Sequence, residues 1–404
     1  MLPSRVSLRR GMLVAFLPIA LALVMSGEAA AQKVVKVGVI LTYSGPDASL
    51  SEPIDRAFEL YMKLHKQDLP PGVEVQVIKR DDTGPKPDVA KRLAQELIVR
   101  DHIQILSGGL WTPNVAATAP LATDAKIPYV LMSSGTASTT RLSPYIARLS
   151  FTQWQMSYQL GKWAPANGRR TAVTLVSDYA PGYDGEAAFT RGFTEGGGSI
   201  VTAMRIPVAS PDYVPFLERA RQMKPDCLYV FSPGGSAATA FIKAYHELGL
   251  DTAGIQLVTS GGTLPDDELP NMGDAALGVI SASHYSASGD RPANRAFVAE
   301  WKKEYGPDAL PNYFSPGGWD AMAAIYTLAR EEKGDIDLER SMDILKHWSN
   351  PDSPRGPIRI DPETRDIIQN IYLRRVEKVN GILTNVEFAT VPAVKDPWKE
   401  FNPP

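Results

Sequence analysis

The stretch ILSGGLWTPNVAATAPLA, at residues 105–122, contains the structural unit that decides the fold. An apolar strand pattern runs to Ser107, two glycines follow it, and Thr112 stands before a helical pattern at 114–124. Glycines at this point let the backbone approach a ligand, and the free N–H groups of the helix face the same crevice. The arrangement suits a carboxylate or another small anion. The simpler alternative is an ordinary turn in which Thr112 is an N-cap.

The same strand–loop–helix unit repeats along the chain. Strands are expected at 33–41, 73–81, 103–107 and 128–132, and again at 171–176, 199–206, 226–231 and 255–259. Helices are expected between them at 53–66, 87–100, 114–124, 185–195, 214–223 and 237–248. This alternation predicts an α/β fold with parallel sheets and right-handed crossovers. Two successive sets of units predict two similar lobes.

The remaining residues are too few for a third domain. Helices are expected at 293–305, 319–332 and 338–349, followed by strands at 357–361 and 370–376 and by a Pro-rich tail. This material completes the two lobes, so the chain crosses between them more than once, and such connectivity makes a hinge. We therefore expect one lobe from 32–152 with 284–360 and a second lobe from 153–283 with 361–404.

The first 31 residues have the pattern of a secretory signal peptide. Three arginines precede an uncharged apolar run at 12–25, and small residues at 29–31 fit cleavage after Ala31. The alternative is an uncleaved anchor, but the run is shorter than the ~20 residues that span a bilayer. The residue directly after the cleavage site is not a cysteine, so we expect a periplasmic protein without a lipid anchor.

Composition and motifs argue against several classes of function. The net charge of −3 gives no electrostatic case for binding nucleic acid. Cys227 is the only cysteine and lies in a buried-strand pattern, so neither a disulfide nor a cysteine-based zinc site is expected. The chain has no G-x-x-x-x-G-K-[ST], H-E-x-x-H or G-x-S-x-G motif.

The titratable residues do not form a catalytic set. Of the five histidines, only His284, which follows a strand pattern, is placed to reach a cleft. Asp81 and Asp82 end a strand, and we interpret them as a solvated turn rather than as a metal site or an acid–base pair. We expect no enzyme activity, no metal and no cofactor, with an exported hydrolase as the alternative.

Small and polar residues gather at the carboxyl ends of the expected strands, where ligands bind in open α/β sheets. Six segments share this character: 43–46, 107–112, 133–136, 178–183, 232–236 and 260–263. Any one of them is more simply a turn, but several at corresponding strand ends of two lobes predict a shared cleft. Ser44, Gly234 and Gly261 are ligand-binding candidates from these segments.

Four stretches, taken in order, resemble the leucine/isoleucine/valine-binding protein family, the periplasmic receptors of branched-chain amino acid ABC transporters. They are VGVILTYSGP at 37–46, the stretch at 105–122, IPYVLMSSGTA at 127–137 and YFSPGGWDAMAA at 313–324. The resemblance extends over essentially the whole chain after residue 31. It implies a type I periplasmic binding fold, in which two Rossmann-like lobes joined by three hinge segments close on a small solute without catalysis.

By motif position, the resemblance implies ligand contacts in both lobes. Carboxylate contacts are implied for Leu110 and Thr112, with Trp111 between them, and for a second loop of Ser133, Ser134, Gly135 and Thr136. Contacts from the other lobe are implied for Tyr179 and Tyr183.

One departure from the family concerns the ammonium group of an amino acid. Amino-acid binders of the family usually carry an acidic side chain after the strand that matches 255–259, whereas residues 260–263 here read SGGT. A buried ammonium needs a charged partner, which Asp178 could supply. Otherwise the solute is an aromatic or aliphatic carboxylate, or an amide. Its walls would then be Trp111, Tyr179, Tyr183 and Tyr285.

The resemblance implies a monomeric receptor that passes a small carboxylate-bearing solute to an ABC permease of the inner membrane. The solute would be an amino acid or an aromatic or aliphatic acid. A ligand-sensing module of a periplasmic signalling system is the alternative that would use the same cleft.

Overall fold

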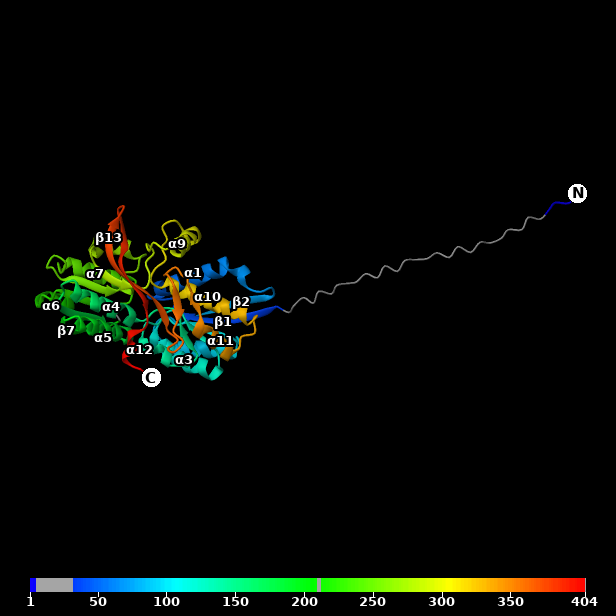
Figure 1. Cartoon of the computed structure of the whole chain (residues 1–404), viewed down its shortest axis with the longest axis horizontal. Coiled ribbons are helices and arrows are strands. Elements are labelled where there is room, and N and C mark those ends of the chain that lie inside the picture. The colour runs from blue at the N-terminus through cyan, green and yellow to red at the C-terminus, as the bar shows by residue number, and fades with distance from the viewer. Residues whose placement is uncertain (5–31, 209–211, 404) are drawn as a thin grey trace. The chain divides into compact units, whose positions relative to one another are not determined.

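The structure is a computed structural model that describes residues 1–4, 32–208 and 212–403. The expected signal peptide lies almost entirely outside these described residues. From residue 32 onward, Figure 1 shows two regions of helices and strands, one blue to cyan and the other mainly green. Within the described residues, no helix combines the length and the apolar character needed to cross a membrane.

The first region is built on a parallel sheet in which five strands are described, in the order β2-β1-β3-β4-β5. The strands are β1 (Lys33–Leu41), β2 (Val73–Asp81), β3 (Ile105–Gly108), β4 (Tyr129–Leu131) and β5 (Ile146–Arg148). The helices are α1 (Ala48–Leu64), α2 (Pro87–Val99), α3 (Thr112–Ala125), α10 (Ser315–Glu331) and α11 (Leu338–His347). Val35, Val37 and Val39 of β1 are fully buried, as expected for a parallel strand with both faces covered.

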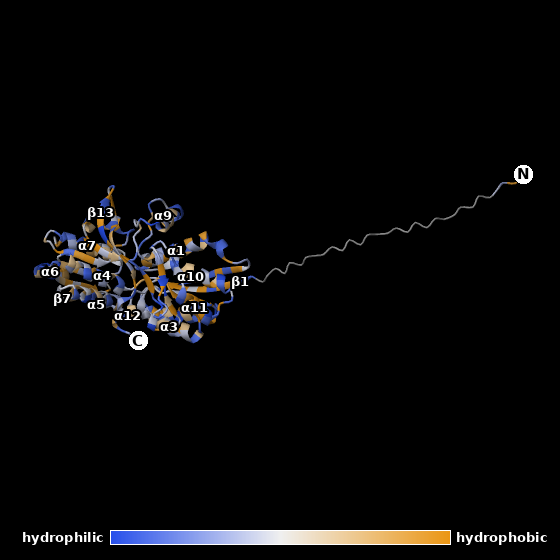
Figure 2. Ribbon diagram, in the orientation of Figure 1, coloured by the Kyte–Doolittle hydropathy of each residue, from blue (hydrophilic) through white to orange (hydrophobic). Residues whose placement is uncertain are grey.

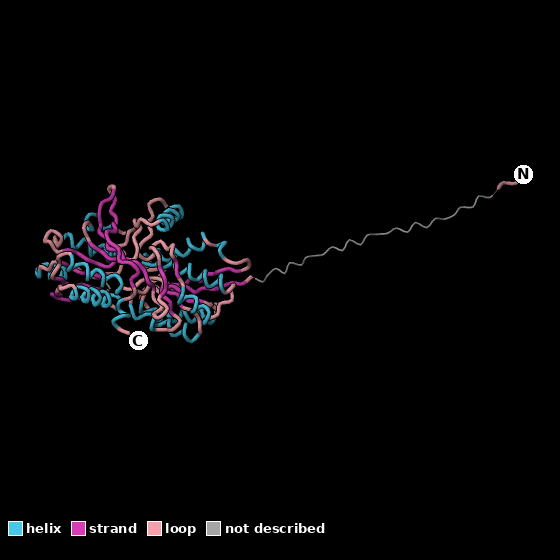
Figure 3. The backbone as a smooth tube through the Cα atoms, viewed as in Figure 1, coloured by secondary structure: helices cyan, strands magenta, loops and turns pink. Residues whose placement is uncertain are grey.

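The second region contains a larger sheet, whose described strands follow the path β11-β12-β13-β10-β9-β8-β6-β7, with β14 beside β13. The parallel part consists of β6 (Thr171–Ser177), β7 (Ser199–Ile206), β8 (Cys227–Phe231), β9 (Gln256–Ser260) and β10 (Ile280–Ser283). The antiparallel part consists of β11 (Ser349–Asn350), β12 (Ile358–Ile360), β13 (Ile367–Val379) and β14 (Ile382–Val394). Of these strands, β11 and β12 lie beside α11 of the first region, and β13 continues from there into the second. The helices are α4 (Gln153–Ala166), α5 (Ala180–Glu195), α6 (Val214–Met223), α7 (Ser236–Glu247), α8 (Leu269–Met272) and α12 (Pro397–Phe401). The remaining helix, α9 (Pro292–Tyr305), packs against α1 of the first region. Figure 3 shows the helices of both regions outside the strands.

Three segments connect the regions, so the fold is the expected α/β fold with two Rossmann-like lobes and a three-segment hinge. They are the links from β5 to α4, from β10 to α9 and from β12 to β13. β13 pairs with β12 at Ile367 and with β10 at Leu373, and therefore runs through the junction as one strand. Residues 32–404 group as one compact unit, and the expected lobe boundaries at 152/153, 283/284 and 360/361 stay a prediction.

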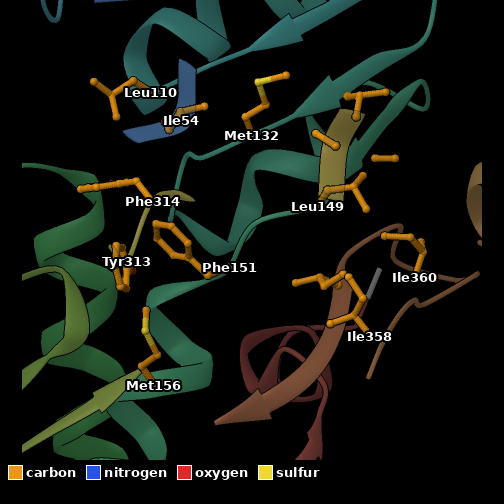
Figure 4. Packing of buried hydrophobic residues seen from close by; sticks show 14 of the residues in the cluster. Ile54, Leu110, Met132, Leu149, Phe151, Met156, Tyr313, Phe314, Ile358 and Ile360 are labelled. Carbon is orange, nitrogen blue, oxygen red and sulfur yellow. The ribbon is translucent and has the colours of Figure 1, made fainter. Parts of the chain in front are cut away.

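One buried cluster extends through both regions. It includes Val37 of β1, Phe189 of α5 and Tyr229 of β8. Figure 4 shows part of it, where Phe151, Tyr313 and Phe314 approach one another near the junction. The strands in Figure 2 are mostly orange, which matches their apolar sequences. Apolar packing thus continues up to the region between the two sheets.

The helices and strands expected from the sequence are present, with ends that differ by a few residues, but six described α-helices and strands were missed: β5, β11, β14, α4, α8 and α12. β10 was expected only as a strand before His284, without bounds. α4 starts at a capping box in which Thr152 accepts from Gln155 N–H and the Gln155 side chain accepts from Thr152 N–H. The expectation of a Pro-rich tail was wrong, because β14 occupies that part of the chain. Pro392 fits there because it lies at a break in the β13–β14 register.

Candidate functional site

A cavity of about 480 Å³, part of it open to solvent, lies where loops of the two sheets meet. The first sheet and its hinge segment contribute Leu110, Trp111, Thr112, Ser133, Gly135, Phe151 and Gln153. The loops of the second sheet contribute Tyr179, Pro181, Phe231, Ser232, Pro233, Gly234 and Gly262. Leu50, Tyr313 and Phe314 complete the lining. None of these described residues carries a charged side chain.

The loop between β3 and α3 brings backbone and hydroxyl donors to the cavity. Gly108 and Gly109 have φ angles of +96° and +79°, a region that other residues rarely adopt. A Cβ on Gly108 would lie 2.3 Å from Ile40 O, so the strand packing also requires glycine. The chain can therefore turn sharply and place Thr112 as the first residue of α3, where the helix N–H groups and dipole favour an anion.

The loop after β4, residues 133–137, has every carbonyl oxygen bound by a protein donor. The donors, in order along the loop, are Ser150 Oγ (2.7 Å), Arg148 Nη1 (2.6 Å), Gln153 N (2.9 Å), Arg148 Nη1 (2.7 Å) and Arg148 Nη2 (3.2 Å). The acceptors of the loop are thus already engaged inside the protein. The loop can therefore offer a ligand its own hydroxyl and N–H groups, which suit a carboxylate.

The hydroxyl groups of the two loops meet. Thr112 Oγ1 lies 3.1 Å from Ser134 Oγ and 3.0 Å from Thr136 Oγ1, within hydrogen-bond distance of both. Ser134 has a φ of +68°, which is uncommon for a non-glycine residue and is typical of backbone fixed for function. The carboxylate donors implied for the two loops therefore form one cluster.

Arg148 holds a buried positive charge behind this cluster. Its side chain is fully buried, and Nε lies 2.6 Å from Asp366 Oδ1, while Lys399 pairs with the other oxygen of the same carboxylate. Burial alone would raise the pKa of Asp366, but the charges of Arg148 and Lys399 outweigh burial and lower it below its usual value. Asp184 and Asp396 place two further carboxyl groups beside Arg148 and Lys399, so Arg148 acts on the loop through its hydrogen bonds to the carbonyl oxygens and not through an excess of positive charge.

Trp111 forms one wall of the cavity and is fixed by buried polar groups. Its Nε1 donates to Thr42 Oγ1 at 2.9 Å, and that hydroxyl donates to Asp82 Oδ1 at 2.6 Å. Asn114 Nδ2 donates to the other Asp82 oxygen at 2.8 Å. The interpretation of Asp82 as part of a solvated turn was wrong, because Asp82 is buried. Burial raises its pKa, although the hydrogen bonds from Thr42 and Asn114 oppose the rise.

Other aromatic rings complete the walls. Tyr179 lies 6.4 Å from Trp111 and 5.9 Å from Phe231 between ring centroids. Tyr313 lies 4.5 Å from Phe151 between ring centroids. The cavity is therefore lined mainly by aromatic and other apolar groups, as small-molecule sites generally are, with a few convergent donors.

Two buried polar atoms at the cavity have no hydrogen-bond partner among the described residues. They are the Tyr313 hydroxyl and Gln153 Oε1. Burial raises the pKa of Tyr313 well above its usual value, and the Gln153 amide is near enough to oppose that rise without forming a hydrogen bond of standard geometry. An unmade hydrogen bond at a buried group is costly, so both atoms favour a polar group on the ligand.

The structure brings half of the candidate residues to the cavity. Seven line it: Leu110, Trp111, Thr112, Ser133, Gly135, Tyr179 and Gly234. Ser134 and Thr136 support it through Thr112, and Gly261 packs against Tyr313, which lines it.

The other candidates lie away from the cavity lining. Ser44 bonds Asp81, and Asp178 and Tyr183 pair with each other on exposed surface. Tyr285 is buried in a separate cluster with Phe297 and Trp301. Asp178 is therefore not placed to pair with an ammonium in the cavity.

Most of the aromatic and amide residues that sequence reasoning missed come from the β5–α4 hinge segment and from the segment before α10. Phe151 and Gln153 follow the unexpected strand β5, and Tyr313 and Phe314 come just before α10. The helix was expected to start at residue 319, although Ser315-Pro316 was the signal that α10 begins directly after this aromatic pair. His284 lies behind the lining, stacked on Phe151 at 5.1 Å, and burial holds its pKa well below its usual value.

The groups that line the cavity can bind a small solute. The described residues contain no group of three or more His, Cys, Asp or Glu side chains placed to hold a metal ion. The cavity combines an anion-binding corner, aromatic walls and two unpartnered polar atoms. Together with two α/β lobes and a three-segment hinge, this cavity defines the class of type I periplasmic solute-binding proteins.

The chain belongs to the periplasmic binding protein family, whose family model matches residues 34–381. It is 38% identical over 376 residues to Leu/Ile/Val-binding protein homolog 6 of Brucella melitensis, covering 92% of this chain and 95% of the relative. The resemblance to leucine/isoleucine/valine-binding proteins is thereby confirmed. The family is one of periplasmic proteins that bind small solutes and work with membrane permeases.

Two solved structures are similar over almost their whole length. One is a solute-binding protein of an ABC transporter from Rhodopseudomonas palustris BisB5 in complex with 3,4-dihydroxybenzoic acid; it is 46% identical, with a TM-score of 0.87, over 91% of this chain and 99% of that chain. The other, also from R. palustris, is in complex with 4-hydroxybenzoate; it is 38% identical, with a TM-score of 0.86, over 90% and 98%. These similarities support a role for the chain in solute import.

Proposed function

We propose that this protein is the solute receptor of an ABC importer for a monocyclic aromatic carboxylate. The observation that carries the proposal is the loop at 133–137, whose carbonyl oxygens are all occupied by protein donors. Such a loop can donate to a carboxylate from its hydroxyl and N–H groups, whereas it offers an ammonium only neutral hydroxyl oxygens and no charged partner. The carboxylate would lie at Thr112 and Ser133, at the N-terminus of α3.

The absence of charge in the lining argues against an α-amino acid. A buried ammonium without a charged partner costs several kcal/mol, on the order of 5 or more. The described lining residues include no acidic side chain, and Asp178 is exposed outside the cavity. An acid without an α-amino group avoids this cost.

The aromatic walls favour a planar ring. Trp111, Tyr179 and Phe231 can contact one face or edge of such a ring, and Phe151 and Tyr313 can contact the other. The similar proteins in complex with 3,4-dihydroxybenzoic acid and 4-hydroxybenzoate support the same ligand class. Ring–ring contacts add about 0.5–1.5 kcal/mol each beyond area burial.

Function then follows from closure of the lobes. A solute held by the loops of the first sheet gains contacts from the second sheet only when the lobes approach, so binding favours the closed form. The closed monomer would deliver the solute to an inner-membrane permease. Removal of residues 1–31 would leave the receptor free in the periplasm.

Isothermal titration calorimetry on ligand-free protein tests the proposal. We expect 4-hydroxybenzoate, 3,4-dihydroxybenzoate or benzoate to bind with micromolar or lower Kd, and 4-hydroxybenzamide, which lacks the carboxylate charge, to bind far more weakly. Leucine is the matched amino-acid probe and should give no measurable heat of binding. Micromolar binding of leucine, or equal affinity for the amide and the acid, would refute the proposed ligand class.

A further inference from the structure

A hydrogen bond joins the donor loop to the opposite lobe without touching the cavity. Ala137 N donates to Asp184 Oδ2 at 2.6 Å. Ala137 ends the loop after β4 and begins the 3₁₀ turn at Ala137–Arg141, whereas Asp184 lies in α5 of the second region. The carboxylate thus binds a backbone N–H at the start of a helical turn, where such groups lack a partner within the turn.

The bond connects elements of different sheets. α5 packs against β6 and β8 of the larger sheet, and the loop continues from β4 of the first sheet. Neither Asp184 nor Ala137 is among the residues that line the cavity. Asp184 can therefore influence the position of the loop without contacting a ligand.

The surroundings keep Asp184 suited to this contact. Burial raises the pKa of its carboxyl, while Ala137 N–H and the positive charges of Arg148 and Lys399 act in the opposite direction. Arg148 is also the donor to three carbonyls of the same loop. Arg148 and Ser150 therefore hold four of the five loop carbonyls from the first region, Gln153 N at the start of α4 holds the fifth, and Asp184 of the second region holds one N–H group of the loop.

The C-terminal helix α12 makes a second set of contacts at this place. On the side of the loop, Lys399 Nζ donates to Thr140 Oγ1 at 2.9 Å and the Arg141 guanidinium lies 4.5 Å from the Trp398 ring. On the side of α4 and α5, the Phe401 ring lies 5.6 Å from Tyr158. These contacts keep the 137–141 turn close to α5, where Asp184 can reach it.

We infer that Asp184 is a positioning residue that stabilises the closed receptor by binding Ala137 N–H across the cleft. The inference rests on the proposed function for the choice of probe ligand, but not for the contact itself. Because Asp184 does not touch the ligand, it raises the lifetime of the closed complex equally for all ring substituents. It also favours closure in the absence of ligand.

Dissociation kinetics provide the first test. We expect Asp184→Ala to raise koff for 4-hydroxybenzoate about tenfold, which corresponds to about 1.4 kcal/mol, because the variant loses a hydrogen bond to a charged group. The on-rate should stay within about twofold, and the ratio of affinities for 4-hydroxybenzoate and benzoate should not change. Asp184→Asn keeps an oxygen acceptor without the charge and should give an intermediate koff.

Glu186→Gln is the matched control. Glu186 lies on the same helix but pairs with Arg205 and Thr174, both in the same region, and makes no contact across the cleft. Its replacement should leave koff unchanged even if it lowers thermal stability. An equal rise in koff for Asp184→Asn and Glu186→Gln would overturn the inference, because it would indicate a general loss of stability.

A distance measurement without ligand separates this inference from the proposed function. Val99 on α2 and Val201 on β7 are exposed, and Cys227 is buried, so cysteines at these two positions can be spin-labelled. We expect Asp184→Ala to shift the distance distribution of the ligand-free protein toward longer values. An unchanged distribution would overturn the role of Asp184, whereas failure of the unsubstituted protein to bind any aromatic acid would overturn only the proposed ligand class.

Discussion

Trp111 and Thr42 are joined by a hydrogen bond of 2.9 Å from the indole Nε1 to the threonine hydroxyl, and both side chains are buried. The Thr42 hydroxyl in turn donates a hydrogen bond to one carboxylate oxygen of Asp82, and Asn114 donates to the other oxygen. The orientation of an aromatic wall thus depends on a carboxylate that a ligand never contacts. Such supporting groups commonly determine how well a site holds its shape.

Replacing Thr42 with valine should weaken ligand binding. Thr42→Val keeps the volume but leaves the Trp111 indole N–H without its partner and removes one of the two hydrogen bonds to Asp82 Oδ1, which keeps the bond from Gly84 N–H, at a cost of about 1–3 kcal/mol in the free energy of unfolding. We expect the affinity for the aromatic acid to fall by up to about tenfold as Trp111 loses its fixed orientation. Calorimetry and urea denaturation measure the two effects.

Thr118→Val is the control, since that hydroxyl bonds to Asn114 O and Val115 O in its own helix. Equal affinity losses in both variants would contradict the prediction.

Removing the Tyr313 hydroxyl should change selectivity rather than general affinity. The hydroxyl is buried at the cavity without a partner, as is Gln153 Oε1, and a hydroxylated ring can bond both. We expect Tyr313→Phe to lower the affinity for 4-hydroxybenzoate or 3,4-dihydroxybenzoate about tenfold and that for benzoate less than about twofold. Competition titrations with the three acids give these ratios.

Tyr305→Phe controls for the loss of a tyrosine hydroxyl elsewhere. That hydroxyl bonds Arg56 O outside the cavity, so the variant should keep the original order of affinities. The prediction for Tyr313 fails if benzoate and the hydroxylated acids lose affinity by the same factor.

The buried ion pair of Arg148 with Asp366 should give stability that depends on pH. The pKa of Asp366 is lower in the folded protein than the usual value of about 3.9. Its contribution is therefore complete above that value and is lost as pH falls through the folded pKa. We expect Asp366→Asn to cost about 3–5 kcal/mol at pH 7 and much less near pH 3, measured by urea denaturation.

Asp274→Asn is the exposed counterpart of this variant. Asp274 pairs with Lys378 at the surface, and its replacement should change the free energy of unfolding by less than about 1 kcal/mol. A cost for Asp366→Asn that is the same at both pH values would show that the ion pair is not the cause.

The sequence was sufficient for the parts of the fold that follow local patterns. β1, β2, β7 and α6 have the expected bounds because their apolar residues recur with the period of a strand or a helix. β5 was missed because three residues are too few to establish a period. β14 was missed because a proline such as Pro392 is uncommon inside a strand, and only the pairing with β13 shows that this proline is tolerated.

The site residues likewise divide into those that local patterns predict and those that depend on contacts between distant parts of the chain. Thr112 and Ser133 could be predicted as site residues because each lies in the loop that follows a strand whose carboxyl end faces the cleft. Gln153 and Tyr313 could not, because the hinge brings them together from positions 160 residues apart. No local pattern shows that Tyr285, which also follows a strand, points instead into a cluster with Phe297.

The position of β13 in the larger sheet has a consequence for how the protein is made. β10 pairs with β9 on one side and with β13 on the other, so a growing chain that ends before residue 367 has no strand for that second side. Its unpaired N–H and C=O groups then form an edge that can pair with another chain. Residues 367–379 therefore close this side of the sheet, and until they do the nascent protein depends on being kept apart from its neighbours.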